Sequence, residues 1–344
     1  MSKKQSKDNV VIVAAAGAGK TTRIVTRGIE NSSERVLITT YTNENADQIR
    51  SLLITHARRI PENVTVIPWF TFLLQHGVRP YQNQLTAAPR ARSIRFQSGG
   101  SIYHKKEKWF TKERDIYSNK LAEFAVECNK IGGGKVIRRL ERIFDTILVD
   151  EVQDLAGYDL DFLEMLFDSS INVMLVGDPR QATFTTNYAG RNRKFRRAGI
   201  TKWFDEMRSK KKAKMDTDTC SHRCNQEICD FADSIYPKFE KTVSANGERT
   251  GHDGIFRIPS SDVKDYLEQY DPVILRFDKR TDTHGLSARN IGLSKGRTFA
   301  RVLIFPTKPM KAFLDSGNPE KAGDRSRLYI AVTRACFSVA FVFD

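Results

Sequence analysis

An apolar run that ends in a glycine-bearing turn, with a lysine directly after it, is the part of the chain best suited to chemistry. It occupies residues 10–22, VVIVAAAGAGKTT. Backbone N–H groups in such a turn, and at the start of the helix that follows it, point at the phosphates of a bound nucleotide. Lys20 adds a mobile positive charge, and the hydroxyl of Thr21 can hold Mg²⁺. The segment therefore predicts a binding site for ATP and Mg²⁺.

One position departs from the common phosphate-loop pattern G-x-x-x-x-G-K-[ST], because Ala14 stands where the first glycine is expected. Gly17 and Gly19 keep the turn free to adopt the conformations that bring backbone close to phosphate. An ordinary strand-to-helix turn is the alternative interpretation. We expect the nucleotide to contact the whole loop, namely Ala16, Gly17, Ala18, Gly19, Lys20, Thr21 and Thr22.

A second apolar run, at residues 147–151, ends in two carboxylates: ILVDE. ATP hydrolysis needs such an acidic strand end, because Mg²⁺ on the phosphates must be held and a water must be aimed at the γ-phosphate. We assign Asp150 to the metal, together with Thr21, and Glu151 to polarising the attacking water. A solvated carboxylate pair is the alternative for these two residues.

The elements that position these groups are visible as apolar runs that alternate with helical patterns. This alternation is typical of βαβ units and a parallel sheet, so we predict an α/β fold. A second α/β section follows a charged connector at 191–214. The predicted strands lie at 10–13, 36–39, 64–67, 144–150, 171–178, 301–305 and 338–343, with helices from 21, at 44–59, at 70–75 and around 327–334.

The alternation stops between about residues 79 and 142, where basic and aromatic residues are interleaved. We interpret this stretch as a small, mostly helical, basic insertion. The 344-residue chain has 56 Lys and Arg against 41 Asp and Glu, a net charge of +15, which favours a polyanionic partner. The predicted domains are a first one at 1–78 and 143–214, the insertion at 79–142, and a second one at 215–344.

Several classes of protein are disfavoured by the sequence. No apolar run approaches the length of a membrane span, and residues 1–8 lack the apolar core of a signal peptide, so we expect a cytoplasmic protein without a membrane partner. The five cysteines favour reduced thiols. A zinc site is the alternative for Cys220, His222, Cys224 and Cys229, but residues 226–236 form a single helical pattern instead of a ligand loop.

An ordered set of motifs resembles the UvrD/Rep-like superfamily 1 DNA helicases over nearly the whole chain except the insertion. The acidic strand end continues as DEVQD at 150–154, which is similar to that family's DExQD box. The other motifs are TTYTNENA at 39–46, PWFTF at 68–72, GDPRQ at 177–181, SHR at 221–223, SKGRTF at 294–299 and RLYIAVTRA at 327–335. They resemble the family's TFTNKAA, TFHSF, GDDDQ, NYR, SKGLEF and RLLYVALTRA.

The resemblance implies two RecA-like P-loop NTPase domains that hydrolyse ATP at the cleft between them while the protein moves along single-stranded DNA, 3′ to 5′. It implies that Arg223 and Arg334 neutralise charge on the phosphates, with Arg334 as the arginine finger. Gln181 senses the γ-phosphate, and Gly296 lies at the nucleotide.

The resemblance also implies a track for single-stranded DNA, in which aromatic rings stack on bases. A place in the core is the alternative for Trp69 and Phe184. The basic runs at 191–197 and 210–214 would clamp duplex phosphates at a junction, or simply form a solvated face. The expected track residues are Tyr41, Trp69, Phe70 and Phe184, with Thr42 and Asn43 bound to sugar or phosphate.

The chain also departs from the family. His222 and Thr298 replace an adenine-stacking tyrosine and a ribose-contacting glutamate, and Thr186 and Asn187 replace a Trp-Arg pair whose role passes to Tyr188 or Arg191. Residues 223–294 leave no room for the large accessory insertion of the second motor domain, so the chain resembles a short member. The alternative function is therefore a nucleotide-gated DNA-binding switch that serves a nuclease, repair or phage-defence protein without sustained unwinding.

Overall fold

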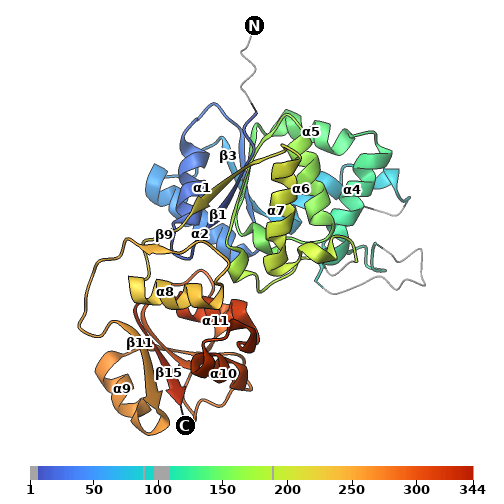
Figure 1. The fold of residues 1–344 in the computed structure, drawn as a ribbon. Helices are drawn as coiled ribbons and strands as arrows, with labels where there is room; N and C mark the ends of the chain where they lie inside the picture. Colours follow the sequence, from blue (N-terminus) through green and yellow to red (C-terminus); the bar gives the residue numbers. More distant parts are fainter. Residues whose placement is uncertain (1–6, 88–89, 97–108, 188–189, 344) are drawn as a thin grey trace. The chain divides into compact units, whose positions relative to one another are not determined.

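A computed structural model describes residues 7–87, 90–96, 109–187 and 190–343 (Figure 1). The chain divides into two compact units. Unit 1 contains Met1–Val13, Lys20–Pro179 and Phe184–Thr217, and unit 2 contains Ala14–Gly19, Arg180–Thr183 and Asp218–Asp344. Most of the phosphate loop and the turn at Gln181 therefore group with the C-terminal part of the chain.

The described part of unit 1 contains a six-stranded sheet in the order β3-β2-β6-β7-β1-β8. The pairs from β3 to β1 are parallel, as the sequence predicts. Apolar runs form these strands because helices cover both faces of a parallel sheet. The strands are β1 (Val10–Ala14), β2 (Val36–Thr40), β3 (Val64–Pro68), β6 (Thr146–Val149), β7 (Asn172–Gly177) and β8 (Lys214–Asp218).

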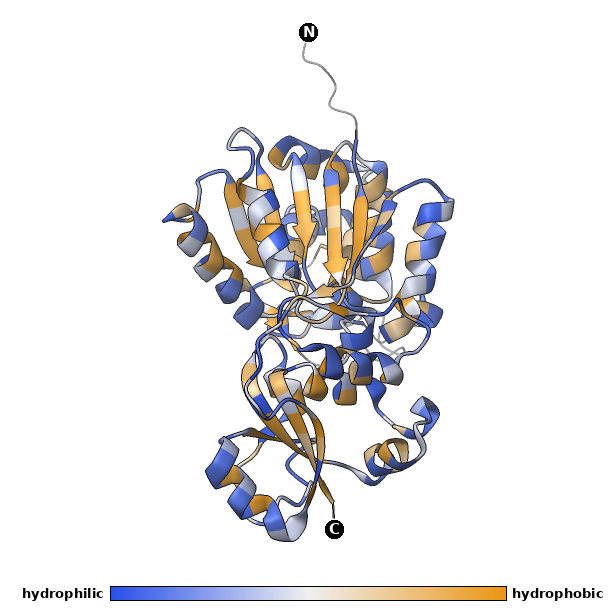
Figure 2. Cartoon of the chain, turned by 60° about the vertical axis from the view of Figure 1, so that its left-hand side comes forward, coloured by the Kyte–Doolittle hydropathy of each residue, from blue (hydrophilic) through white to orange (hydrophobic). Residues whose placement is uncertain are grey.

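The helices of unit 1 are amphipathic, as the alternation of blue and orange along them shows beside the mostly orange strands (Figure 2). The helix after β3 continues directly into a π-helical segment, Leu73–Val78. The helices are α1 (Lys20–Ile29), α2 (Asn43–Ala57), α3 (Trp69–Phe72), α4 (Leu121–Ile131), α5 (Lys135–Ile143), α6 (Tyr158–Asp168) and α7 (Ile200–Ser209).

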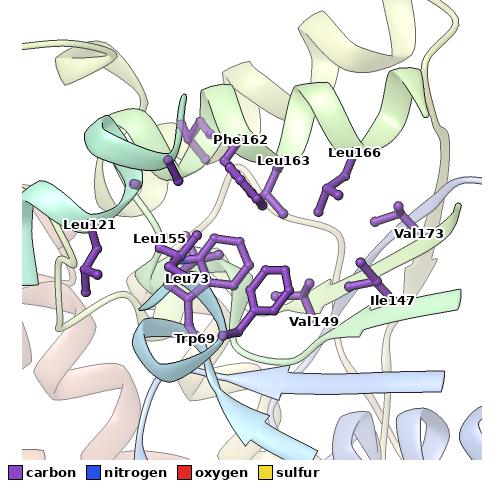
Figure 3. Close-up of a cluster of buried hydrophobic side chains, with 14 of the residues drawn as sticks. Trp69, Leu73, Leu121, Ile147, Val149, Leu155, Phe162, Leu163, Leu166 and Val173 are labelled. Atoms are coloured by element: carbon purple, nitrogen blue, oxygen red, sulfur yellow. The ribbon is translucent and has the colours of Figure 1, made fainter. Parts of the chain in front are cut away.

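The described part of the insertion consists of helices and one short ladder, in which β4 (Ile94–Arg95) pairs in parallel with β5 (Ile116–Tyr117). Its helix α4 is not separate from the rest of unit 1. Leu121 and Phe124 of α4 are fully buried in the same core cluster as Trp69 and Phe162 (Figure 3). The insertion therefore shares its hydrophobic core with the sheet domain.

Unit 2 contains a five-stranded sheet in the order β11-β15-β14-β12-β13, in which every pair is parallel. A short parallel pair, β9 with β10, leads into it. Its strands are β9 (Cys220–Ser221), β10 (Val243–Ser244), β11 (Gly254–Pro259), β12 (Val273–Arg276), β13 (Arg289–Asn290), β14 (Phe299–Phe305) and β15 (Ala335–Phe343). Its helices are α8 (Gln226–Ile235), α9 (Val263–Tyr270), α10 (Lys308–Ser316) and α11 (Arg325–Val332).

Candidate functional site

The phosphate loop follows β1 and owes its shape to two glycines with left-handed backbone. Gly17 has φ +82° and Gly19 has φ +71°. A Cβ on Gly17 would lie 2.5 Å from Oγ of Ser221 and 2.8 Å from Cβ of Arg223, whereas a Cβ on Gly19 would meet nothing within 4 Å. A side chain at position 17 would collide with Ser221 and Arg223, so the protein requires glycine there. Gly19, in contrast, borders open space beside Lys20.

The loop is held by the segment that carries Arg223. The N–H of His222 donates to the carbonyl of Gly17 (3.0 Å), and the N–H of Ala15 donates to the carbonyl of Asp218 (2.8 Å). Nη1 of Arg223 donates to the carbonyl of Thr333 at 3.0 Å. Within unit 2, the structure thus brings Arg223 against the loop. Of the other predicted loop residues, Ala16 and Ala18 are buried, and Gly19 and Thr22 are exposed.

Thr21 and Asp150 meet although they are far apart in sequence. Lys20 and Thr21 begin α1, and Oγ1 of Thr21 donates to Oδ2 of Asp150 at 2.9 Å. Asp150 is buried. Burial, followed by the negative charge of Glu151, raises the pKa of Asp150 well above its usual range. A hydroxyl and a buried carboxylate whose charge is disfavoured form a donor set that suits Mg²⁺, because a cation would stabilise the ionised carboxylate.

Glu151 is held by Gln153, a residue for which the sequence predicts no role. The backbone of Glu151 has φ +56°, and its N–H donates to Oδ1 of Asp150 at 2.9 Å. Nε2 of Gln153 donates to Oε2 of Glu151, and Oε1 of Gln153 accepts from the N–H of Asp178 at 3.0 Å. Gln153 thus connects the candidate base to the end of β7. Its place in the DEVQD motif was the available signal.

Gln181 and Arg334 also come together, within unit 2. Nη2 of Arg334 donates to Oε1 of Gln181 at 3.3 Å, and Nη1 donates to the carbonyl of Arg297 at 3.2 Å. Nε of Arg334 donates to the carbonyl of Ile330 in α11 at 3.2 Å. Gly296, directly before Arg297, is exposed and has φ +81°. Gln181 and Arg334 are therefore hydrogen-bonded to each other, and Gly296 precedes the residue whose carbonyl accepts from Arg334.

Arg180 anchors the turn that carries Gln181. It stands where the helicase motif has an acidic residue, and it is only 3% exposed. Its Nη1 lies 3.4 Å from Oδ1 of Asp233, and its guanidinium lies 4.9 Å from the ring centroid of Tyr329 and 5.4 Å from that of Phe239. The ion pair and the two cation–π contacts hold the turn in unit 2. No role for Arg180 was predicted.

Tyr41 and Phe184 form a pair of accessible rings. Tyr41 follows β2, and its ring centroid lies 5.7 Å from that of Phe184 and 5.7 Å from that of Phe70. Phe184 is 38% exposed, so it does not occupy the core. Thr42 caps α2 by accepting from the N–H of Asn45 at 3.1 Å, and Asn43 is exposed at the first turn. These residues present an aromatic and polar surface beside the end of β2.

The prediction that Trp69 stacks on bases is wrong. Its side chain is fully buried between Leu73, Leu155 and the neighbouring aromatic rings (Figure 3). Its Nε1 donates to Oδ1 of Asp159 at 2.7 Å. Phe70 is only 6% exposed and packs against Tyr41, so it supports a neighbouring ring and offers little surface of its own. The first turn of α3 places both side chains toward the core.

Asp159 joins Trp69 to the segment after Phe184. Oγ1 of Thr186 donates to its Oδ2 at 2.5 Å. Burial raises the pKa of Asp159 to about 6, against the opposing effect of these hydrogen bonds. Thr186, at the position of the helicase Trp-Arg pair, is therefore part of a buried network. Arg191 pairs with Asp161 at 2.5 Å, and Tyr188 lies outside the described residues.

The lysine run at 210–214 is engaged in ion pairs. Lys210 lies 3.0 Å from Glu164, and Lys212 lies 2.7 Å from Asp168. This pairing favours the solvated-face interpretation of the run over a phosphate clamp. The described residues contain no group of three or more His, Cys, Asp or Glu that could hold a metal ion. None of the helices in the described ranges is long and apolar enough to cross a membrane.

Comparisons with solved structures match this chain to helicases. They include the PRRSV helicase (16% identity, TM-score 0.47, covering 98% of this chain and 52% of that chain). Arterivirus nonstructural protein 10, a helicase, matches with 15% identity and a TM-score of 0.49, covering 98% of this chain and 59% of that chain. The structure of that protein in complex with DNA matches with 15% identity and a TM-score of 0.50, covering 98% of this chain and 61% of that chain.

The last of these likenesses extends to the fold, so the α/β fold with parallel, RecA-like sheets predicted from the sequence is confirmed. This chain spans between 52% and 61% of the length of these helicases. The comparison with curated proteins gave no match. The family model AAA_19, described as an AAA domain, matches residues 1–187. Since that match covers more than half of the sequence, the chain belongs to the AAA domain family.

Proposed function

We propose that the chain is an ATP hydrolase that uses Mg²⁺ and moves along single-stranded DNA, in the manner of the UvrD/Rep-like superfamily 1 helicases. The hydrogen bond between Thr21 and Asp150 carries this proposal, because it joins the phosphate loop to the acidic strand end with Glu151 directly after it. A binding protein without hydrolysis would need the loop but not this pair of carboxylates.

The reaction is the attack of water on the γ-phosphorus of ATP. Glu151 accepts a proton from this water while the new P–O bond forms, the bond between the γ-phosphorus and the bridging oxygen breaks, and ADP leaves. Gln153 keeps the Glu151 carboxylate in place through its own bond to Asp178. Mg²⁺, held by Thr21 and Asp150, would neutralise charge on the phosphate oxygens.

Arginines supply the rest of the positive charge. Arg223 lies against the phosphate loop, next to Gly17. Arg334 acts as the arginine finger, because a guanidinium binds two phosphate oxygens at once. Its bond to Gln181 links the charge on the nucleotide to the turn that leads to Phe184. In this proposal Gln181 reports loss of the γ-phosphate to the nucleic-acid surface.

The nucleic acid is single-stranded DNA, held by the rings of Tyr41 and Phe184 and by Thr42 and Asn43. The two exposed or half-buried rings support this assignment, since aromatic faces accept unpaired bases. Arterivirus nonstructural protein 10, solved with DNA, supports the choice of a nucleic-acid partner. The direction, 3′ to 5′, follows from the motif resemblance alone.

A second candidate function is a nucleotide-gated DNA-binding switch for a repair or defence protein. The burial of Thr186 against Asp159 favours it, because the helicase Trp-Arg pair that couples hydrolysis to stacking is replaced there by a structural contact. ATP hydrolysis with and without single-stranded DNA, followed by displacement of streptavidin from a biotinylated strand, separates the two. A motor hydrolyses ATP and displaces streptavidin, whereas a switch binds DNA without displacement.

A further inference from the structure

Four aromatic rings of unit 1 form a continuous row. Its order is Phe184, Tyr41, Phe70 and Phe96, with successive centroid distances of 5.7, 5.7 and 5.8 Å. The rings come from four segments that are distant in sequence, and Phe96 belongs to the basic insertion. The two ends of the row are its most exposed rings, with Phe184 38% exposed and Phe96 70% exposed, whereas Tyr41 is half-buried.

Phe96 follows a segment whose backbone is fixed. It comes directly after β4, where Ile94 pairs with Ile116 and Arg95 with Tyr117. The N–H of Arg92 donates to the carbonyl of Arg114 at 3.0 Å, and the guanidinium of Arg95 lies 3.6 Å from Asp115. The exposed ring is thus presented from a hydrogen-bonded ladder and packs its remaining surface on Phe70 at an interplanar angle of 60°.

The charge of the insertion indicates which kind of partner binds the exposed ring of Phe96. Residues 79–142 contain 15 Lys or Arg against six Asp or Glu, so more than half of the chain's excess positive charge lies in this stretch. An apolar protein partner would not need that excess, whereas a nucleic acid does. A single strand combines a polyanionic backbone with unpaired bases that stack on aromatic rings, and a duplex does not expose its base faces.

We propose that Phe96 is a base-stacking residue and that the insertion extends the single-strand surface beyond Tyr41 and Phe184. The proposal rests on the proposed function, which identifies the partner as single-stranded DNA. It assigns to the insertion a contact with bases as well as with phosphates. Because Phe70 is nearly buried, it serves as the bridge that keeps the ring of Phe96 in line with that of Tyr41.

The test compares the full-length wild type with Phe96→Ala, Phe96→Tyr and the control Ile131→Ala. Ile131 is in the same insertion and is 56% exposed, so its loss removes a similar amount of accessible apolar surface. Anisotropy of a fluorescein-labelled oligo(dT) measures Kd at two salt concentrations, and a duplex of the same length serves as a second probe. Thermal unfolding and hydrolysis of ATP without DNA are measured on the same samples.

Loss of one stacked base predicts that Phe96→Ala weakens oligo(dT) binding by about 5- to 150-fold. The salt dependence should keep its slope because no phosphate contact is lost. Phe96→Tyr and Ile131→Ala should bind like the wild type, and duplex binding should not change. Unchanged oligo(dT) affinity for Phe96→Ala, or equal losses for both probes, would overturn the proposal. A wild type that binds oligo(dT) but never hydrolyses ATP would refute the proposed function and leave the result for Phe96 intact.

Discussion

Arg334 and Gln181 are joined by a hydrogen bond of 3.3 Å between Nη2 and Oε1, although 153 positions separate them in the sequence. The same guanidinium donates to the carbonyls of Ile330 and Arg297, so it is held from three sides. A residue held in this way is pre-positioned, so in the proposed function it would lose little conformational entropy on binding a phosphate.

This relationship predicts a strong effect of Arg334→Lys. Lysine keeps the charge but lacks the planar fork, so kcat for ATP should fall by about 10³-fold or more while the Kd for a fluorescent nucleotide changes only a few-fold. Steady-state kinetics and nucleotide titration measure the two quantities. Arg257→Lys, an exposed arginine paired with Asp315, is the control and should hydrolyse ATP like the wild type. Wild-type kcat for Arg334→Lys would remove the finger assignment.

Changing each of the two loop glycines to alanine should have a different effect, mainly on stability for Gly17 and mainly on nucleotide affinity for Gly19. Both have positive φ, which costs about 1 kcal/mol for any residue with a Cβ. Gly17→Ala adds a collision with Ser221 and Arg223, so its free energy of unfolding should fall by roughly 1–3 kcal/mol more. Position 19 borders open space, so Gly19→Ala should keep most of its stability. It should lose nucleotide affinity, because in the proposed function the methyl group would enter the space that a phosphate needs. Urea unfolding and nucleotide titration check both variants, and wild-type affinity for Gly19→Ala would contradict the loop assignment.

Asp159 should make stability depend on pH in a defined direction. Burial raises its pKa to about 6 in the folded chain, above the ordinary value of 3.8. Between these values the folded state holds a proton that the unfolded state has released, so the stabilising contribution falls as pH rises through this window and is flat above it. The total change is roughly 3 kcal/mol.

Urea unfolding of the wild type and of Asp159→Asn between pH 4 and pH 7 isolates this contribution, because asparagine cannot titrate. The free energy of unfolding of the wild type minus that of Asp159→Asn should fall steadily as pH rises toward 6 and stay constant above that window. Asp168→Asn, on the exposed side of the same helix, is the control. A difference that does not vary with pH would contradict the burial argument.

Substitutions at Trp69 and Tyr41 should affect different properties, namely stability and nucleic-acid binding. Trp69→Phe leaves Asp159 without one buried donor, so it should lower the free energy of unfolding by about 1–3 kcal/mol without changing the Kd for oligo(dT). Tyr41→Ala should do the reverse, with about 5- to 150-fold weaker binding and little loss of stability. Denaturation and anisotropy measure both. Normal binding by Tyr41→Ala would remove that ring from the track.

The sequence predicted what periodicity and chemistry determine locally. The apolar patterns predict the strands and their parallel order. The needs of a nucleotide site predict that Thr21 and Asp150 lie together. The position of Trp69 did not follow, because its partner Asp159 is 90 positions away and PWFTF does not say which side chains face the core. For the same reason the sequence does not predict that α4, in the insertion, shares the core of unit 1 through Phe124.

The hydrogen-bond partners of side chains also could not be predicted from the sequence. Gln153 could be named from its motif but not connected to Glu151 and Asp178, because those bonds depend on how the ends of β6 and β7 meet. The contact between Phe96 and Phe70 depends on the β4–β5 ladder, which the sequence does not predict. The roles given to the nucleotide and track residues stay predictions until they are measured.

The most direct measurement is ATP hydrolysis by the wild type, Lys20→Ala and Glu151→Gln, each with and without single-stranded DNA. The wild type should hydrolyse ATP, and DNA should accelerate it. Both variants should be inactive, and Glu151→Gln should still bind nucleotide because it loses only the proton acceptor. Sustained hydrolysis by either purified variant, or a wild type that binds nucleotide but does not hydrolyse it, would contradict the account.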